Sequence, residues 1–237
     1  MDEITLRSNI ERVQERIAAA EQRVGRTGQV ALIAVSKTHP AETVAQAYCA
    51  GLRVFGENRV EEAGPKAEAV RALLSATFGS EISIEWHMIG HLQSRKAADV
   101  LPWASLVHSV DTVKLAGRLS RAAPKGRVLP VLLEVNVSGE QTKAGFRPEE
   151  LAAAVGTMAA LPSLRIEGLM TMAPIVEDPE QARPVFRVLR KLRDQLARHN
   201  PALPWTHLSM GMTDDFEVAI EEGATLVRIG RAIFGER

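Results

Sequence analysis

The sequence predicts an α/β fold: a single (β/α)8 TIM-type barrel with an additional helix before the first strand. Eight short apolar segments alternate without a break with segments of helical periodicity, and such alternation favours a parallel sheet with helices outside it. Eight units favour closure into a barrel, because closure leaves no edge strand to protect. The 237 residues suit this fold, which typically takes about 250. A doubly wound open sheet is the alternative.

The expected elements follow one another from the N-terminus. Apolar residues at near-helical spacing from Ile4 to Val24, with charges between them, predict a long amphipathic helix. Buried strands are expected at the apolar runs 30–37, 52–58, 82–90, 105–110, 127–137, 163–170, 204–210 and 224–230. Helices are expected between them at 41–50, 60–74, 94–100, 113–122, 148–160, 179–199 and 214–221. No linker of Pro, Gly and Ser divides the chain, so residues 1–237 are predicted to form one domain.

Composition and charge narrow the functional classes. The 29 basic and 29 acidic residues cancel, so the charge does not favour a nucleic-acid partner. The charged N-terminus does not resemble a signal peptide, and no apolar run approaches the roughly 18 residues of a membrane span. We therefore expect a cytoplasmic protein without a membrane segment. The single cysteine, Cys49, excludes an intrachain disulfide and is expected to be buried in its helix.

Polar residues at the predicted strand ends locate a candidate site, because active sites of such barrels lie at the carboxyl ends of the strands. The residues expected there are Lys37, Asn58, His91, Ser109, Asn136, Met170, Thr171, Ser209, Arg228 and Gly230. Lys37 follows an apolar run and a serine, which should direct its amine to the mouth of the barrel. A partly desolvated lysine amine is nucleophilic and forms Schiff bases. A lysine that only marks the exit of the strand into water is the alternative.

The turns after the last two strands predict a phosphate site. In these barrels a phosphate often binds there, at the N-terminus of a short extra helix. Ser209 and Gly211 occupy the first turn, and Gly230 and Arg231 occupy the second. Backbone amides near Gly230 would face the anion, with the Ser209 hydroxyl and the Arg231 charge beside it. Ordinary turn glycines are the alternative.

Other polar residues are expected to have structural roles. Asp214 and Asp215 follow Thr213 at a predicted helix start, which favours helix capping by Thr213 over a catalytic carboxylate pair. The polar loop 138–146 would either fold over the mouth or lie as a mobile surface loop. No metal site is predicted, and three histidines are expected to line the barrel or its rim: His87, His91 and His108.

Seven segments from the strand ends and the turns after them form one pattern. They are VSKTHP (35–40), FGENRVEE (55–62), WHMIGHLQSRK (86–96), VNVSGEQTKAGF (135–146), GLMTMAP (168–174), LSMGMTDDFEVAIEEG (208–223) and VRIGRAIFG (227–235). Together, and in this order, they resemble the pyridoxal phosphate homeostasis protein family over nearly the whole chain. The resemblance implies the barrel of fold-type III enzymes of pyridoxal 5′-phosphate (PLP), such as alanine racemase, without their C-terminal β domain.

The resemblance implies a role for each matching residue. Lys37 would form an internal aldimine with PLP, which makes PLP the expected, covalently held cofactor. Arg228 would face the pyridine nitrogen, Asn58 would lie beside the ring and Met170 near its face. The phosphate would be held, mainly through backbone amides and the serine hydroxyl, by Ser209, Gly211, Gly230 and Arg231. The family often has threonine at position 231, so Arg231 is a departure from its pattern.

These residues argue against robust catalysis. An arginine facing the pyridine nitrogen keeps that nitrogen unprotonated, and an unprotonated ring is a poorer electron sink. Racemisation would need an acid or base on each face of the ring, and the only tyrosine, Tyr48, is expected in a helix away from the mouth. We therefore expect a monomeric carrier or regulator of vitamin B6 supply that hands PLP to PLP-dependent apoenzymes.

Three alternatives stay open. The first is a weak PLP-dependent amino-acid racemase. The second is a barrel enzyme that uses Lys37 for aldol chemistry on a sugar phosphate, and such a protein would be colourless. The third is an interaction scaffold, against which the clustered strand-end residues argue.

Overall fold

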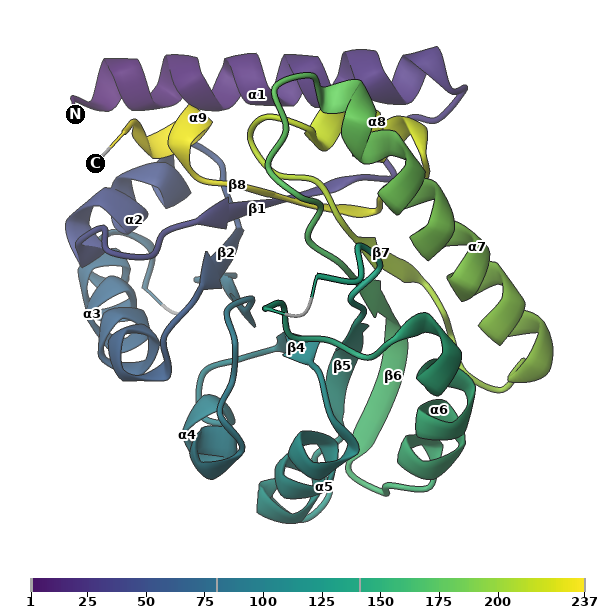
Figure 1. Ribbon diagram of the computed structural model, residues 1–237. Coiled ribbons are helices and arrows are strands. Elements are labelled where there is room, and N and C mark those ends of the chain that lie inside the picture. Colours follow the sequence, from purple (N-terminus) through teal and green to yellow (C-terminus); the bar gives the residue numbers. More distant parts are fainter. Residues whose placement is uncertain (1, 80, 141, 237) are drawn as a thin grey trace.

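The computed structural model describes residues 2–79, 81–140 and 142–236. Across them, eight parallel strands close into a barrel in the order of the sequence (Figure 1). The strands are β1 (Ala31–Val35), β2 (Val54–Glu57), β3 (Glu85–Met88), β4 (Leu106–Val110), β5 (Leu129–Glu134), β6 (Leu164–Met170), β7 (His207–Ser209) and β8 (Leu226–Ile229). Ala31 pairs with Leu226 and Ala34 with Ile229, which closes the ring. The predicted barrel is confirmed, and the open-sheet alternative is wrong.

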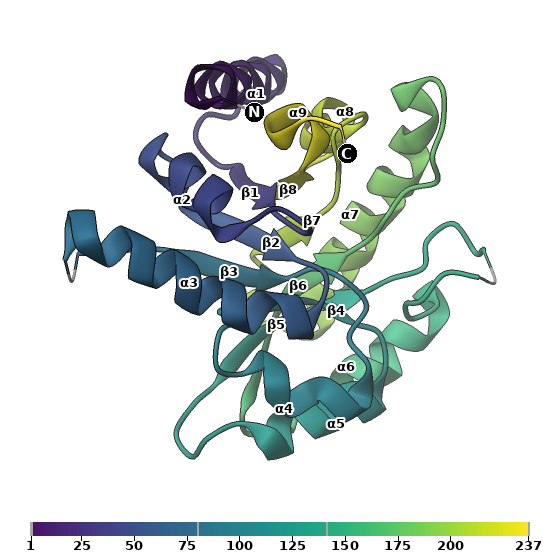
Figure 2. The ribbon, with the colours of Figure 1, turned by 90° about the vertical axis from the view of Figure 1, so that its left-hand side faces the viewer.

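The helices of the barrel match the predicted ones. They are α2 (Ala41–Cys49), α3 (Val60–Phe78), α4 (Ala97–Val100), α5 (Val113–Ala122), α6 (Leu151–Ala159), α7 (Arg183–His199), α8 (Phe216–Glu221) and α9 (Arg231–Phe234). Short 3-10 turns precede α4, α6 and α7, at Ser94–Lys96, Pro148–Glu150 and Pro179–Ala182. Figure 2 shows that the loop between β5 and α6 projects from the side on which α3 begins, which is the mouth of the barrel.

The additional N-terminal helix, α1 (Glu3–Arg23), covers α8 and α9 (Figure 1). Its buried side chains recur every three or four residues, as in an amphipathic helix, at Leu6, Ile10, Val13, Ile17 and Ala20. Full burial of each larger apolar side chain stabilises the fold by about 1.5–3 kcal/mol. The helix begins where the Asp2 carboxylate accepts a hydrogen bond of 2.7 Å from the Thr5 amide.

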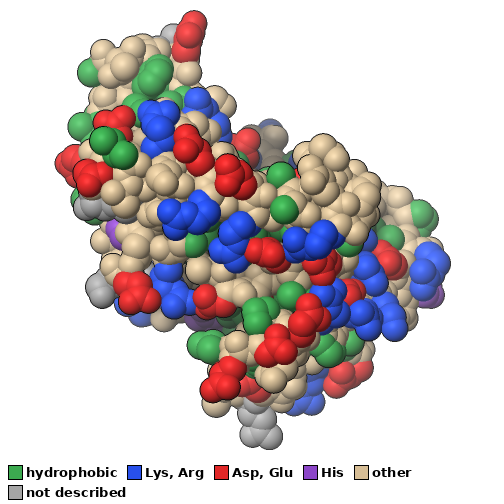
Figure 3. Space-filling view, turned by 90° about the horizontal axis from the view of Figure 1, so that it is seen from above, with side chains coloured by type: hydrophobic (Ala, Val, Ile, Leu, Met, Phe, Trp, Pro, Cys, Tyr) green, Lys and Arg blue, Asp and Glu red, His purple; other side chains and the backbone are tan. Residues whose placement is uncertain are grey.

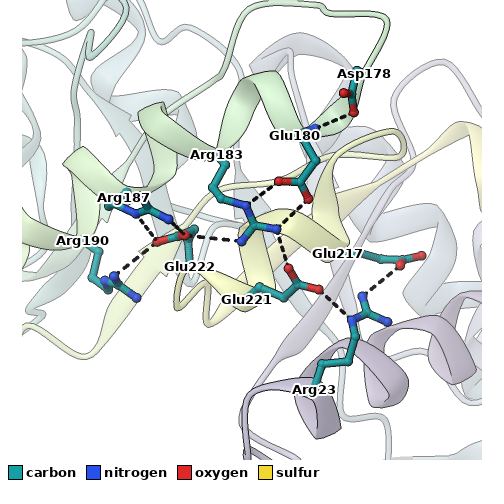
Figure 4. A network of polar contacts seen from close by, with 9 residues as sticks. All are labelled: Arg23, Asp178, Glu180, Arg183, Arg187, Arg190, Glu217, Glu221 and Glu222. Carbon is teal, nitrogen blue, oxygen red and sulfur yellow. Dashed lines mark hydrogen bonds and ion pairs between the residues drawn. The ribbon is translucent and has the colours of Figure 1, made fainter.

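An ion network joins α1 to α7 through α8 (Figure 4). Arg23 of α1 and Arg183 of α7 contact the same carboxylate, that of Glu221, each at 2.6 Å. The neighbouring Glu222 is buried and contacts three arginines of α7, namely Arg183, Arg187 and Arg190. Acidic and basic side chains are interspersed over this face of the molecule (Figure 3), so opposite charges are compensated locally.

Cys49 is exposed, so its predicted burial is wrong. The buried face of α2 consists of Val44, Ala47 and Tyr48, and the next residue points about 100° away around the helix. Tyr48 lies at the end of the barrel opposite the mouth. Its hydroxyl accepts a hydrogen bond of 3.2 Å from the amide of Ser83, which precedes β3.

Candidate functional site

Lys37 lies just beyond the carboxyl end of β1. The hydroxyl of the preceding Ser36 donates to Glu57 Oε1 at 2.7 Å. The buried Glu57 side chain faces outward, because its partner Lys66 belongs to α3, and the buried Ser36 hydroxyl contacts the same carboxylate oxygen as Lys66. The next residue, Lys37, is half-buried and opens the turn that leaves β1 at the mouth of the barrel.

A buried ion cluster holds the residues on both sides of Lys37. The Lys66 ammonium donates to the Ser36 carbonyl at 2.9 Å and to the carboxylates of Glu57 and Glu62 at 2.7 Å each. Glu62 also accepts from the Thr38 amide at 2.5 Å. Burial raises the pKa of Glu57, although the hydrogen bonds from Lys66 and Ser36 oppose the shift. We call Ser36, Glu57, Glu62 and Lys66 the α3 clamp.

A second polar group lies inside the barrel and ends in Arg228. The buried guanidinium donates to the hydroxyl of Ser209 and, at 3.0 Å, to the Thr171 carbonyl. Ser209 Oγ lies 2.8 Å from Nδ1 of His108, and Nε2 of His108 lies 3.0 Å from Nδ1 of His87. We call Arg228, Ser209, His108 and His87 the interior column.

The interior column shares the inside of the barrel with apolar side chains. One cluster inside the barrel consists of Ile33, Leu106, Leu132, Met170 and Leu226. Burial, followed by the charges of His87 and Arg228, lowers the pKa of His108 well below its usual value. Burial lowers the pKa of Arg228 to about 10 despite the carboxylates of Glu134 and Asp215. At neutral pH the arginine is therefore charged and the histidine is neutral.

Glu134, at the end of β5, is a buried carboxyl group that the sequence analysis missed. Its side chain is 4% exposed, and Oε2 has no hydrogen-bond partner among the described residues. Burial, with a contribution from Asp111, raises the pKa of Glu134 to about 7. The predicted strand ran to residue 137, so the strand-end pattern selected Asn136 although β5 ends at Glu134.

Two glycines at the mouth are closely packed. Gly211 has φ of 91°, and a Cβ there would lie 2.6 Å from Cβ of Ala219. A Cβ at Gly230 would lie 3.3 Å from the Val35 carbonyl oxygen, so the end of β8 packs closely against the end of β1. Gly230 is also the N-cap of α9, the predicted short final helix.

The remaining predicted site residues differ in their surroundings. Asn58 is half-buried directly after β2, and a Cβ at Gly90 would lie 2.4 Å from the Asn58 carbonyl oxygen. Met170 is 1% exposed within the apolar cluster inside the barrel. The exposed Arg231 forms an ion pair with Asp214 across the mouth-side turn. The Ser209 hydroxyl, predicted to contact phosphate, already contacts Arg228 and His108.

The predicted capping role of Thr213 is wrong. α8 begins at Phe216 with Asp215 as its N-cap, and the Asp215 carboxylate turns back to accept a hydrogen bond of 2.6 Å from the Met212 amide. Of the three histidines, His87 and His108 lie inside the barrel, whereas His91 is exposed at the rim, 3.3 Å from Asp111. In the described part of the chain, no cluster of three or more His, Cys, Asp or Glu side chains is arranged to hold a metal ion.

No helix in the described ranges is long and apolar enough to cross a membrane.

Comparison with solved structures supports the fold. Alanine racemase from Corynebacterium glutamicum superposes with a TM-score of 0.70 at 16% identity, covering 100% of this chain and 62% of that one. PipY from Synechococcus elongatus PCC7942, solved with PLP bound, superposes with a TM-score of 0.78 at 37% identity, covering 93% of this chain and 99% of PipY.

Comparison with known sequences identifies the family. Residues 7–237 match the alanine racemase N-terminal domain family. The pyridoxal phosphate homeostasis protein of Aquifex aeolicus (strain VF5) is 47% identical over 231 residues, which cover 96% of each chain. That of Escherichia coli (strain K12) is 40% identical over 233 residues, covering 97% of this chain and 95% of the other. This chain therefore belongs to the pyridoxal phosphate homeostasis protein family.

Proposed function

We propose that this protein binds PLP as an aldimine of Lys37 and serves vitamin B6 homeostasis as a carrier, without robust catalysis of its own. The observation that carries the proposal is the position of Lys37 at the mouth. Its two neighbours in the chain are held in place, Ser36 by Lys66 and Thr38 by Glu62. The family relationship supports the cofactor, because PipY, at 37% identity, was solved with PLP bound.

The residues around the mouth fit the chemical groups of PLP. Arg228 uses two N–H groups on Ser209 and Thr171, and a guanidinium has further donors to offer a ring nitrogen. The close-packed turns at Gly211 and Gly230 would offer backbone amides to the phosphate, with Arg231 adjoining them. In this proposal Asn58 lies beside the ring, Met170 lies beneath it, and the Ser209 hydroxyl acts mainly by holding Arg228.

Weak catalysis follows from the same residues. Bound PLP supplies an electron sink for carbanions, and this sink is strong only when the ring nitrogen is protonated. Arg228 is charged at neutral pH and only donates hydrogen bonds, so it favours an unprotonated nitrogen. Tyr48 lies at the opposite end of the barrel, where it contacts Ser83. We accordingly propose that the protein holds PLP in the cytoplasm as a monomer and transfers it to PLP-dependent apoenzymes.

Glu134 favours a second candidate function, that of a weak amino-acid racemase. It is a buried carboxyl group with a pKa of about 7 and an unpartnered oxygen among the described residues, so it exchanges protons readily near neutral pH. Deuterium exchange at the α-carbon of alanine in D2O tests this candidate. Exchange by the wild type that is abolished in Glu134→Gln would support the racemase. An absence of exchange by the PLP-loaded wild type would support the carrier function instead.

Absorption spectroscopy tests the covalent link. Wild-type protein with PLP should show a band at roughly 420 nm, as expected for a protonated lysine aldimine, and borohydride should fix the cofactor on the peptide that contains Lys37. Lys37→Ala should show only the spectrum of the free aldehyde. Lys125→Ala is the control, because Lys125 is exposed between α5 and β5, at the end of the barrel away from the mouth. Identical spectra for Lys37→Ala and wild type would refute the Schiff base at Lys37.

A further inference from the structure

The hydrogen bonds of the interior column have only one consistent direction. A guanidinium only donates, so Ser209 Oγ accepts from Arg228. The single hydroxyl proton of Ser209 needs an acceptor, and Nδ1 of His108, at 2.8 Å, is the one within reach among the described residues. Ser209 therefore donates to His108, and Nδ1 of His108 carries no proton.

The same count of donors and acceptors determines which ring nitrogen of His87 carries a proton. A neutral imidazole without a proton on Nδ1 carries it on Nε2, so His108 donates to Nδ1 of His87 at 3.0 Å. His87 then carries its own proton on Nε2, which points toward the Glu85 carboxylate at 3.6 Å. That separation is too long for a direct hydrogen bond, but the negative charge favours a proton on this nitrogen. Each group of the interior column therefore donates its proton in the same direction, away from Arg228 and toward Glu85.

Stability alone does not require histidines at these positions. Both histidines are buried, and burying polar groups is unfavourable unless each is hydrogen-bonded. Replacing both partners of a buried hydrogen bond by apolar groups of similar shape is often nearly neutral for stability. What the two histidines add is a fixed acceptor for the Ser209 hydroxyl.

We infer that His108, backed by His87, is a positioning residue that acts through Ser209 to orient the Arg228 guanidinium toward the mouth of the barrel. A Ser209 hydroxyl committed to His108 presents its lone pairs to Arg228 in one direction. Together with the Thr171 carbonyl at 3.0 Å, this holds the guanidinium at two points. The inference rests on the proposed function, in which Arg228 contacts the ring nitrogen of PLP.

A double-mutant cycle on PLP binding tests this inference. His108→Leu removes the acceptor and should weaken PLP binding about tenfold, the order expected for loosening one charge-assisted hydrogen bond. It should also shift the absorption and emission bands of bound PLP, whereas His108→Asn, which keeps an acceptor near Nδ1, should restore them. Leu106→Met is the matched control for altering the barrel interior and should leave both unchanged.

The cycle separates positioning from a general structural effect. If His108 acts through Arg228, adding His108→Leu to Arg228→Gln should cause no further loss of affinity beyond about twofold. The inference would be overturned if the double variant lost PLP affinity by the product of the two single losses. An unaltered spectrum of His108→Leu would overturn it as well. Failure of the wild type to bind PLP would instead refute the proposed function, so the two failures are distinguishable.

The proton positions can be tested without PLP and without any substitution. Long-range ¹H–¹⁵N spectra of the histidine-labelled protein at pH 7 should show His87 and His108 as neutral rings protonated on Nε2. A His108 ring that is charged, or protonated on Nδ1, would overturn the inference whatever the variants do.

Discussion

Lys66→Met removes the ammonium group at the centre of the α3 clamp while preserving the length of the side chain. In the wild type this group lies 2.7 Å from Glu57 and Glu62 and 2.9 Å from the Ser36 carbonyl. After the substitution, the fully buried Glu57 carboxylate keeps only the hydroxyl of Ser36, because its second oxygen has no partner among the described residues. The carboxylate must then remain charged in the protein interior or take up a proton.

The expected loss of stability follows from the burial of this pair. Removing one partner of a buried ion pair typically costs 3–5 kcal/mol. Lys66 is 8% exposed, and protonation offers Glu57 a partial escape because burial already raises its pKa. The lower end, about 3 kcal/mol in the free energy of unfolding, is therefore expected. For a chain of this size each kcal/mol lowers Tm by about 2–4 °C, which gives roughly 6–12 °C.

Urea and thermal unfolding of the variant measure this loss. Lys96→Met is the matched control, because Lys96 also pairs with a glutamate of α3, the exposed Glu61. Exposed ion pairs are screened by solvent. Adding Glu57→Gln to Lys66→Met should recover part of the loss by removing the buried charge. A Tm for Lys66→Met equal to that of Lys96→Met would refute the clamp as a stabilising element.

Three further predictions concern the mouth. Gly211→Ala should lower the free energy of unfolding by about 1 kcal/mol or more, measured in urea, because it combines positive φ with a Cβ 2.6 Å from Ala219; unchanged stability would contradict the required glycine. Glu134 has a pKa of about 7 in the folded state, above its unfolded value, so the folded state holds this proton more tightly and the resulting stability is lost as pH rises from about 4.5 to 7. Relative to Glu134→Gln, the wild type should lose roughly 3 kcal/mol over this range, and parallel pH profiles would contradict the shift. Arg231→Thr should change PLP affinity less than about threefold if the phosphate is held by backbone amides, because the Arg231 side chain pairs with Asp214; a larger loss by titration would indicate a side-chain contact.

The barrel could be predicted from the sequence because its determinants are local. Each strand is a short apolar run, such as 30–37, and each run precedes a helical pattern that lies within the following residues. The strand-end rule also selected Lys37 and Arg228, since polarity changes sharply where a buried strand reaches the mouth. The position of Cys49 could not be predicted in this way, because it depends on the rotational phase of α2 against the sheet.

The polar groups that support the site depend on contacts between elements. Glu57 and Lys66 meet only because β2 places the carboxylate outward and α3 packs over it. His87 and His108 belong to neighbouring strands, and their contact depends on the register in which His87 pairs with Leu106. A one-residue change in that register would turn a histidine out of the barrel. Sequence periodicity carries no information about such a register.

The packing of α1 against α8 and α9 has a consequence for synthesis of the chain. Arg16 of α1 contacts Glu217, which lies 201 residues later in the chain. At about 5–20 residues per second, a ribosome needs roughly 10–40 s to add that many residues. During this interval the apolar stripe from Leu6 to Ala20 lacks the helices that cover it in the folded protein. The nascent chain thus presents an amphipathic helix to chaperones long before the barrel can close.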